Sequence, residues 1–364
     1  MRLRHLATFV LIATAQFAIF EAGLRTWGSS EAAPAFQGLF DNDPVIGYRL
    51  KPNARTRFTT SEFSAEIAIN DGGLRDDEPM GPKPENERRI VLLGDSLVLA
   101  VQVPFGETFG ELLEKRLNAS NPPVHYRVIN AGVQGYGPIE EQLFFRSIVD
   151  KVQPDLVLPV VFVGNDAEEA VGSRQKLDPN RRTREAVVDS LLTRMRRLVR
   201  RSMVLQILRL RLLPVVNRLS PSVAPPEPPL QSYAANPAPR IAEGLSVARR
   251  SMEDIEHTAA SAGAGTAIVL MPARFQVDDG DYGRLKEIVT GTGGTLVRDA
   301  ASTRFEEALA PIGVPMLDLL PPLRGALPGP DLFYQETVHL TPRGHTVVAA
   351  ALDRFIEEHG LLPR

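Results

Sequence analysis

Short apolar runs alternate with amphipathic segments along most of this chain. Strand-like runs occupy residues 90–93, 126–129, 156–162, 266–271 and 314–319. Segments between and after them carry apolar residues at helical spacing, namely 108–117, 139–149, 240–260 and 346–358. Strands that alternate with helices are typical of βαβ units. The pattern therefore predicts an α/β fold with a central parallel sheet.

A different pattern precedes this domain. Residues 64–70 alternate between polar and apolar side chains and end in a turn-prone Asn-Asp-Gly-Gly sequence, which is typical of a half-exposed strand. A Pro-rich stretch at 80–84 then leads into the first buried run. We expect a small β-rich lead-in over residues 28–85 and the main domain over residues 86–364.

The first residues have the form of a membrane anchor. Two arginines and a histidine precede the stretch 6–20, in which Gln16 is the only strongly polar side chain. This order predicts a transmembrane anchor over residues 1–27 whose basic end stays in the cytoplasm. A cleaved signal peptide is the alternative, with the small residues 33–35 as its cleavage site. Either interpretation places the rest of the chain outside the cytoplasm, in the periplasm or at the cell surface.

The main domain is interrupted by a predicted insertion over residues 172–239. Its part 181–211 holds ten arginines against two acidic residues and keeps helical apolar spacing, and 221–239 holds seven prolines. A basic amphipathic helix is typical of a membrane surface or a partner. The alternative is a helix that packs its apolar face on the domain and leaves its arginines in water. The Pro-rich part indicates an extended connector.

Composition limits the chemistry. The chain has 364 residues, no cysteine and a net charge of −3. Disulfides, thiolate zinc sites and cysteine nucleophiles are therefore excluded. A general nucleic-acid binder normally carries an overall basic excess, so we expect no nucleic-acid partner.

A candidate nucleophile follows the first buried run. Gly94, Asp95 and Ser96 come directly after the strand-like run 90–93. Ligands of open α/β sheets bind beyond the carboxyl ends of the strands, so Ser96 is placed to act as a nucleophile.

A base for this serine is available near the C-terminus. His339 and His345 lie in a loop before the last helix, and Glu336 precedes His339 by three residues. A single turn would bring the Glu336 carboxylate to one imidazole nitrogen of His339 and leave the other nitrogen for the serine.

Oxyanion donors are expected after two further strands. The Gly-rich sequence 130–137 follows one strand, and its glycines permit a backbone N–H to face a crevice. Asn165 follows the next strand and offers a side-chain amide. All these turns would meet at one edge of the sheet.

Taken together, the chain resembles the SGNH hydrolase family, also called GDSL esterases and lipases. The four marker residues of that family are similar in order and spacing to Ser96, Gly132, Asn165 and His339. The resemblance implies a three-layer α/β/α sandwich with a central parallel sheet. It implies Ser96 as nucleophile, His339 as base, and an oxyanion hole made by the Ser96 and Gly132 amides and the Asn165 side chain.

The expected triad acid departs from the family pattern. The family usually has Asp where this chain has Glu336, whose extra methylene lengthens its reach. Asp318, Asp331 or a backbone carbonyl are the alternatives for orienting His339.

The resemblance implies a serine esterase that acts on carboxylic esters, such as O-acetyl groups of envelope polysaccharide or lipid esters, without metal or organic cofactor. An O-acetyltransferase with the same triad is one alternative, and a non-catalytic envelope binding protein on the same fold is another. No feature of the sequence indicates an oligomeric state.

Overall fold

The computed structural model describes residues 38–119, 123–177, 230–291, 293–328 and 331–362. The predicted anchor and the Arg-rich segment lie outside these residues. None of the helices in the described part of the chain combines the length and apolar character needed to cross a membrane. The described residues belong to one compact unit.

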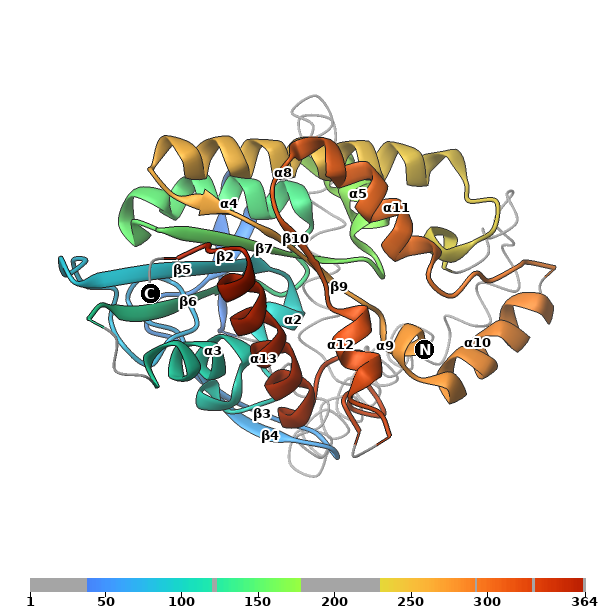
Figure 1. Cartoon of the computed structure of the whole chain (residues 1–364), viewed down its shortest axis with the longest axis horizontal. Coiled ribbons are helices and arrows are strands. Elements are labelled where there is room, and N and C mark those ends of the chain that lie inside the picture. The colour runs from blue at the N-terminus through green and yellow to red at the C-terminus, as the bar shows by residue number, and fades with distance from the viewer. Residues whose placement is uncertain (1–37, 120–122, 178–229, 292, 329–330, 363–364) are drawn as a thin grey trace, which may run out of the picture. The chain divides into compact units, whose positions relative to one another are not determined.

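The centre of this unit is a parallel sheet, as the sequence predicts (Figure 1). Its strands are β5 (Glu87–Gly94), β6 (His125–Gly132), β7 (Leu156–Phe162), β9 (Ile268–Met271) and β10 (Met316–Asp318). They lie in the order β10-β9-β7-β5-β6, and the short strand β8 (Gly265–Thr266) pairs with β7. Every residue of β7 is buried, because helices cover both faces of the sheet.

Helices form a layer on each face of the sheet (Figure 1). The first layer contains α4 (Pro138–Val152), α5 (Asp166–Leu177), α8 (Pro239–Ser261) and α11 (Ala300–Leu309). The second contains α3 (Phe109–Asn118), α12 (Leu320–Gly325) and α13 (Pro342–Glu358). The short helix α9 (Arg274–Val277) and α10 (Asp279–Gly291) follow the carboxyl end of β9. The expected three-layer arrangement is confirmed for these residues.

The strand order creates a crevice at β5. The chain passes from β5 to β6 on one side and then returns to β7 on the other side. Such a reversal of strand order is where open α/β sheets bind ligands, beyond the carboxyl ends of the strands. The one-turn helix α2 (Ser96–Leu99) begins at this point.

The lead-in consists of two antiparallel hairpins. Strand β1 (Phe40–Asp43) pairs with β2 (Gly47–Leu50), and β3 (Arg55–Thr59) pairs with β4 (Ser64–Ala68). Residues of β4 alternate between exposed and buried, as the sequence predicts for the segment 64–70. The hairpins belong to the same compact unit as the sheet.

The predicted insertion, residues 172–239, includes residues that the structure places in the domain. Residues 172–177 continue helix α5, and the short 3-10 helix η3 (Gln231–Tyr233) packs into the domain. Tyr233 is fully buried, and its hydroxyl donates to Gln276 Oε1 at 3.0 Å. The buried side chain of Tyr233 therefore holds in the domain a stretch whose prolines predict an extended connector.

One buried arginine of the lead-in holds the loop after α2. Arg75 is fully buried, and its guanidinium donates to the carbonyls of Leu99, Ala100 and Val103. Burial lowers the pKa of Arg75 to about 10, so the group stays charged at neutral pH. The three carbonyls follow the end of a helix and have few other donors within reach.

Replacing Arg75 by Met is expected to lower the free energy of unfolding by about 3 kcal/mol or more, because several buried carbonyls lose their donor. Urea unfolding followed by circular dichroism measures this. Arg57→Met is the control, because Arg57 and its partner Glu66 are exposed and such a pair contributes about 0–1 kcal/mol. Equal effects of the two substitutions would contradict the role of Arg75.

Candidate active site

Ser96 is the first residue of α2, directly beyond the carboxyl end of β5. The Asp95 side chain caps this helix by accepting a hydrogen bond from the Leu97 N–H at 2.8 Å. Only 8% of the Ser96 surface is exposed. A capped helix start therefore fixes the serine in a nearly buried position.

Gly132 does not leave its amide free, which corrects the expected oxyanion donor. Its N–H donates to Asn130 Oδ1 at 3.0 Å. A Cβ at Gly132 would lie 2.3 Å from the backbone nitrogen of Leu99, so this glycine is needed for the close packing of α2 on β6. The structural role of Gly132 is therefore to let α2 pack closely against β6.

Gly135, three residues further on, has the properties expected of the donor. It is exposed, has a positive φ of 71° and, within the described residues, its N–H has no hydrogen-bond partner. The preceding carbonyl, that of Gln134, accepts a hydrogen bond from Tyr48 Oη at 2.8 Å. In a trans peptide the carbonyl and the N–H point in opposite directions. The bond from Tyr48 therefore turns the Gly135 N–H away from the lead-in.

Asn165 lies between β7 and α5, with its side-chain orientation fixed. Its Nδ2 donates to Glu169 Oε1 at 2.8 Å, and a carboxylate oxygen can only accept. The amide nitrogen therefore faces Glu169, and one of its two N–H groups remains for another acceptor. The Asn165 Oδ1 atom is buried and has no partner among the described residues.

His339 lies in the loop before α13, close to the segment after α2. Its backbone carbonyl accepts from the Tyr334 N–H at 2.9 Å, and the Tyr334 hydroxyl donates to Gln102 O at 3.3 Å. Both ring nitrogens are buried without a hydrogen-bond partner among the described residues. Burial lowers the pKa of His339 to about 4, so the imidazole is neutral at pH 7 and able to accept a proton.

The expected contact between Glu336 and His339 is not formed. The Glu336 side chain is exposed and accepts from Ser61 Oγ at 2.9 Å. Asp331 accepts from the Gln335 side chain at 2.8 Å, and Asp318 accepts from the Leu320 N–H at 2.9 Å. All three acids considered from the sequence have other hydrogen-bond partners in the structure, and neither ring nitrogen of His339 is bonded to Glu336.

His345, the other histidine of this region, has a structural role. Its Nδ1 accepts from the Phe109 N–H at 3.2 Å, and its ring stacks on that of Phe109 at 5.6 Å. Burial, and then the charge of Arg75, lower its pKa to about 3. The proximity of His339 also lowers the pKa, which shows that the two imidazoles are neighbours.

Buried carboxyl groups lie close to this site. Burial raises the pKa of Asp95 to about 6, and burial together with mutual repulsion raises the pKa values of Glu141 and Asp166 well above their ordinary range. Glu141 and Asp166 therefore tend to hold protons at pH 7, whereas Asp95 is largely ionised there and accepts the Leu97 N–H. No group of three or more His, Asp or Glu side chains in the described residues could hold a metal ion.

Sequence reasoning missed Tyr48, Arg75 and Glu169, and it included Gly135 only as one glycine of the stretch 130–137. One contact of the site had a local signal in the sequence. An Asn side chain often accepts a hydrogen bond from the backbone N–H two residues later, as Asn130 does from Gly132. The other contacts join segments far apart in the chain.

Among known proteins, similarity to this chain is found only in solved structures. No family model and no curated protein matches the sequence. The crystal structure of TesA is similar at a TM-score of 0.43 and 11% identity, covering 76% of this chain and 100% of that one. A lipase/acylhydrolase from Enterococcus faecalis has a TM-score of 0.41 and 14% identity, covering 75% and 96%. An acetylxylan esterase from Geobacillus stearothermophilus has a TM-score of 0.40 and 11% identity, covering 74% and 94%.

The ring protons of His339 are expected to titrate with a midpoint near pH 4, below the ordinary value of 6.5, because the charged form is buried without a carboxylate partner. NMR spectra recorded across this pH range measure the midpoint, and the His339→Gln variant assigns the signal. A midpoint at or above 6.5 would show that an acid stabilises the imidazolium.

Proposed function

We propose that this chain is a serine hydrolase that cleaves carboxylic esters. The observation that carries the proposal is the neutral imidazole of His339, with both nitrogens free of partners in the described structure, in a loop that bonds to the segment following the Ser96 helix. Nucleophilic catalysis requires a neutral imidazole within hydrogen-bond reach of the serine, and the proposal assigns these roles to His339 and Ser96.

The reaction follows from these residues. His339 takes the proton of the Ser96 hydroxyl as its oxygen attacks the ester carbonyl. The resulting tetrahedral oxyanion would be held by the N–H groups of Ser96 and Gly135 and by the remaining N–H of Asn165. His339 then returns the proton to the leaving alcohol, and water attacks the acyl-enzyme with the same histidine as base.

Tyr48, which belongs to the lead-in, stabilises one donor of this proposed oxyanion hole. It fixes the peptide that presents the Gly135 N–H, and Tyr136 in turn donates to the Tyr48 carbonyl. Burial, then the nearby acidic residues, raise the pKa of Tyr48 to about 12, so its hydroxyl keeps its proton.

The location and substrate form the finer part of the proposal. The basic residues and apolar stretch at the N-terminus support a membrane anchor with the catalytic domain outside the cytoplasm. Lipid or O-acetyl esters of the cell envelope are the substrates such a location would offer.

Replacing Ser96 by Ala is expected to abolish hydrolysis of a p-nitrophenyl ester and labelling by a fluorophosphonate, because no other group supplies the attacking oxygen. Ser147→Ala, on helix α4, is the matched control and should retain both. The Glu336→Ala variant is expected to lose less than about tenfold in kcat, because its carboxylate bonds Ser61. Unlabelled Ser96 in folded wild-type protein would refute the proposed function.

Replacing Tyr48 by Phe is expected to lower kcat by about tenfold or more with little change in KM, because the Gly135 N–H is no longer held toward the oxyanion. The matched control is Tyr136→Phe, which removes a neighbouring phenol bond but leaves the Gln134 carbonyl bonded. Melting temperatures of both variants separate stability from catalysis. Equal kcat losses in the two variants would show that the Tyr48 bond has no specific role.

A further inference from the structure

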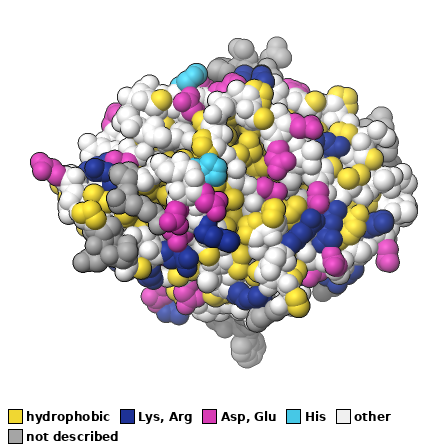
Figure 2. Space-filling model, viewed as in Figure 1, with side chains coloured by type: hydrophobic (Ala, Val, Ile, Leu, Met, Phe, Trp, Pro, Cys, Tyr) yellow, Lys and Arg dark blue, Asp and Glu magenta, His cyan; other side chains and the backbone are white. Residues whose placement is uncertain are grey.

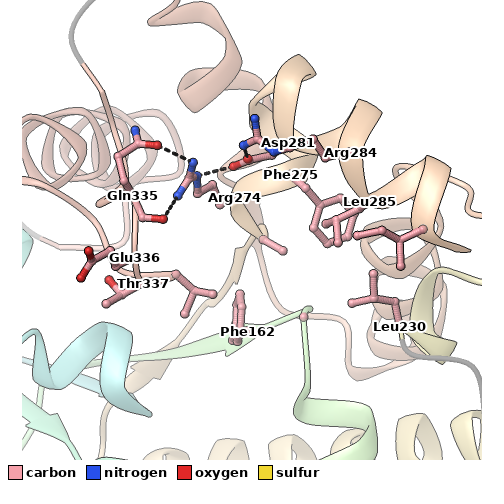
Figure 3. A pocket seen from close by; sticks show the side chains of 14 residues that line it. Phe162, Leu230, Arg274, Phe275, Asp281, Arg284, Leu285, Gln335, Glu336 and Thr337 are labelled. Carbon is pink, nitrogen blue, oxygen red and sulfur yellow. Dashed lines mark hydrogen bonds and ion pairs between the residues drawn. The ribbon is translucent and has the colours of Figure 1, made fainter.

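A largely apolar pocket adjoins the site. Its volume is about 520 Å³, within the usual range of small-molecule sites. Figure 3 shows Phe162 and Leu230 on one side and Phe275 and Leu285 on another, with Glu336 and Thr337 on the opposite wall.

The pocket is lined by residues next in sequence to two of the candidate catalytic residues. Phe162 and Gly164 line it and stand just before Asn165, while residues 336–338 line it and stand just before His339. Both loops that carry Asn165 and His339 therefore contribute to the wall of this cavity.

The charged residues of the pocket are paired with one another. Arg274 donates to the carbonyls of Tyr334 and Gln335 at 2.7 and 2.8 Å, and it forms an ion pair with Asp281 (Figure 3). Asp281 also pairs with Arg284. These bonds join α9 and α10 to the His339 loop. The four charged lining residues, Arg274, Arg284, Asp281 and Glu336, sum to zero net charge, so the pocket favours an uncharged occupant.

The rim of the pocket is apolar and open. Ile288 is 58% exposed and Val338 is 47% exposed, and both line the cavity. Large apolar side chains exposed beside a cavity indicate a surface that a ligand covers. Elsewhere on the face seen in Figure 2, acidic, basic and hydrophobic side chains are interspersed.

We propose that this pocket receives the acyl part of the ester substrate, and that the acyl part is an aliphatic chain longer than acetyl. The inference rests on the proposed function. It assigns Leu285, Ile288 and the other apolar lining residues to substrate specificity. Lipid esters are then favoured over O-acetyl groups, because an acetyl group would leave most of the cavity unfilled.

The experiment compares p-nitrophenyl acetate with p-nitrophenyl octanoate. Each methylene buried in an apolar site raises kcat/KM by roughly threefold, so the six additional methylenes of octanoate are expected to give it an advantage over acetate of about 700-fold if all of them are buried. Leu285→Trp, which fills the cavity, and Ile288→Lys, which places a charge on its rim, should remove most of this preference by lowering kcat/KM for octanoate more than for acetate. Val297→Lys is the matched control, because Val297 is 42% exposed and does not line the pocket.

The outcomes separate the two proposals. Acetate hydrolysis without a preference for octanoate, or a preference that both pocket variants retain, would overturn the acyl pocket and leave the esterase proposal intact. Failure to hydrolyse either ester, with Ser96 unlabelled by the fluorophosphonate, would overturn the esterase proposal and the pocket with it.

Discussion

The close approach of α2 to the sheet edge is the constraint on which this site depends. A Cβ at Gly132 would meet the Leu99 nitrogen, and a Cβ at Gly94 would lie 2.3 Å from the Val98 side chain. At Gly132 the obstacle is backbone, which cannot turn aside as a flexible side chain can. Ser96 can therefore occupy its position only because residues 94 and 132 are glycines, which have no Cβ. The Asp95 cap and the Arg75 bonds hold a geometry that this contact defines.

Burial, more than ion pairing, governs the electrostatics of the site. Burial lowers the pKa of His339 and raises the pKa values of Glu141 and Asp166, so all three side chains are shifted toward their neutral forms. In the proposed reaction, the imidazolium and the oxyanion would be each other's main counter-charge in such surroundings. A base without a carboxylate partner is consistent with this arrangement, although in hydrolases with a full triad the acid contributes substantially to the rate.

The sheet could be predicted because its strands are short apolar runs, and a buried parallel sheet requires such runs. Ser96 and Asn165 lie beyond the carboxyl ends of β5 and β7, as the order of strands and turns along the chain predicts. The choice between Gly132 and Gly135 could not be made from spacing, because it depends on which amide the Asn130 side chain occupies. The position of Glu336 depends on Ser61 and Glu62, which lie in the lead-in and leave no local pattern near residue 336.

The lead-in hairpins contribute Arg75 to the loop after the nucleophile and Tyr48 to the Gly135 turn. Their removal would leave several carbonyls of the site without donors, so the sheet and the hairpins form one cooperative folding unit. A boundary drawn at residue 85 by sequence pattern therefore divides a single energetic unit. Recombining the sheet with another protein's N-terminal segment would carry over the nucleophile but not the contacts that hold it in place.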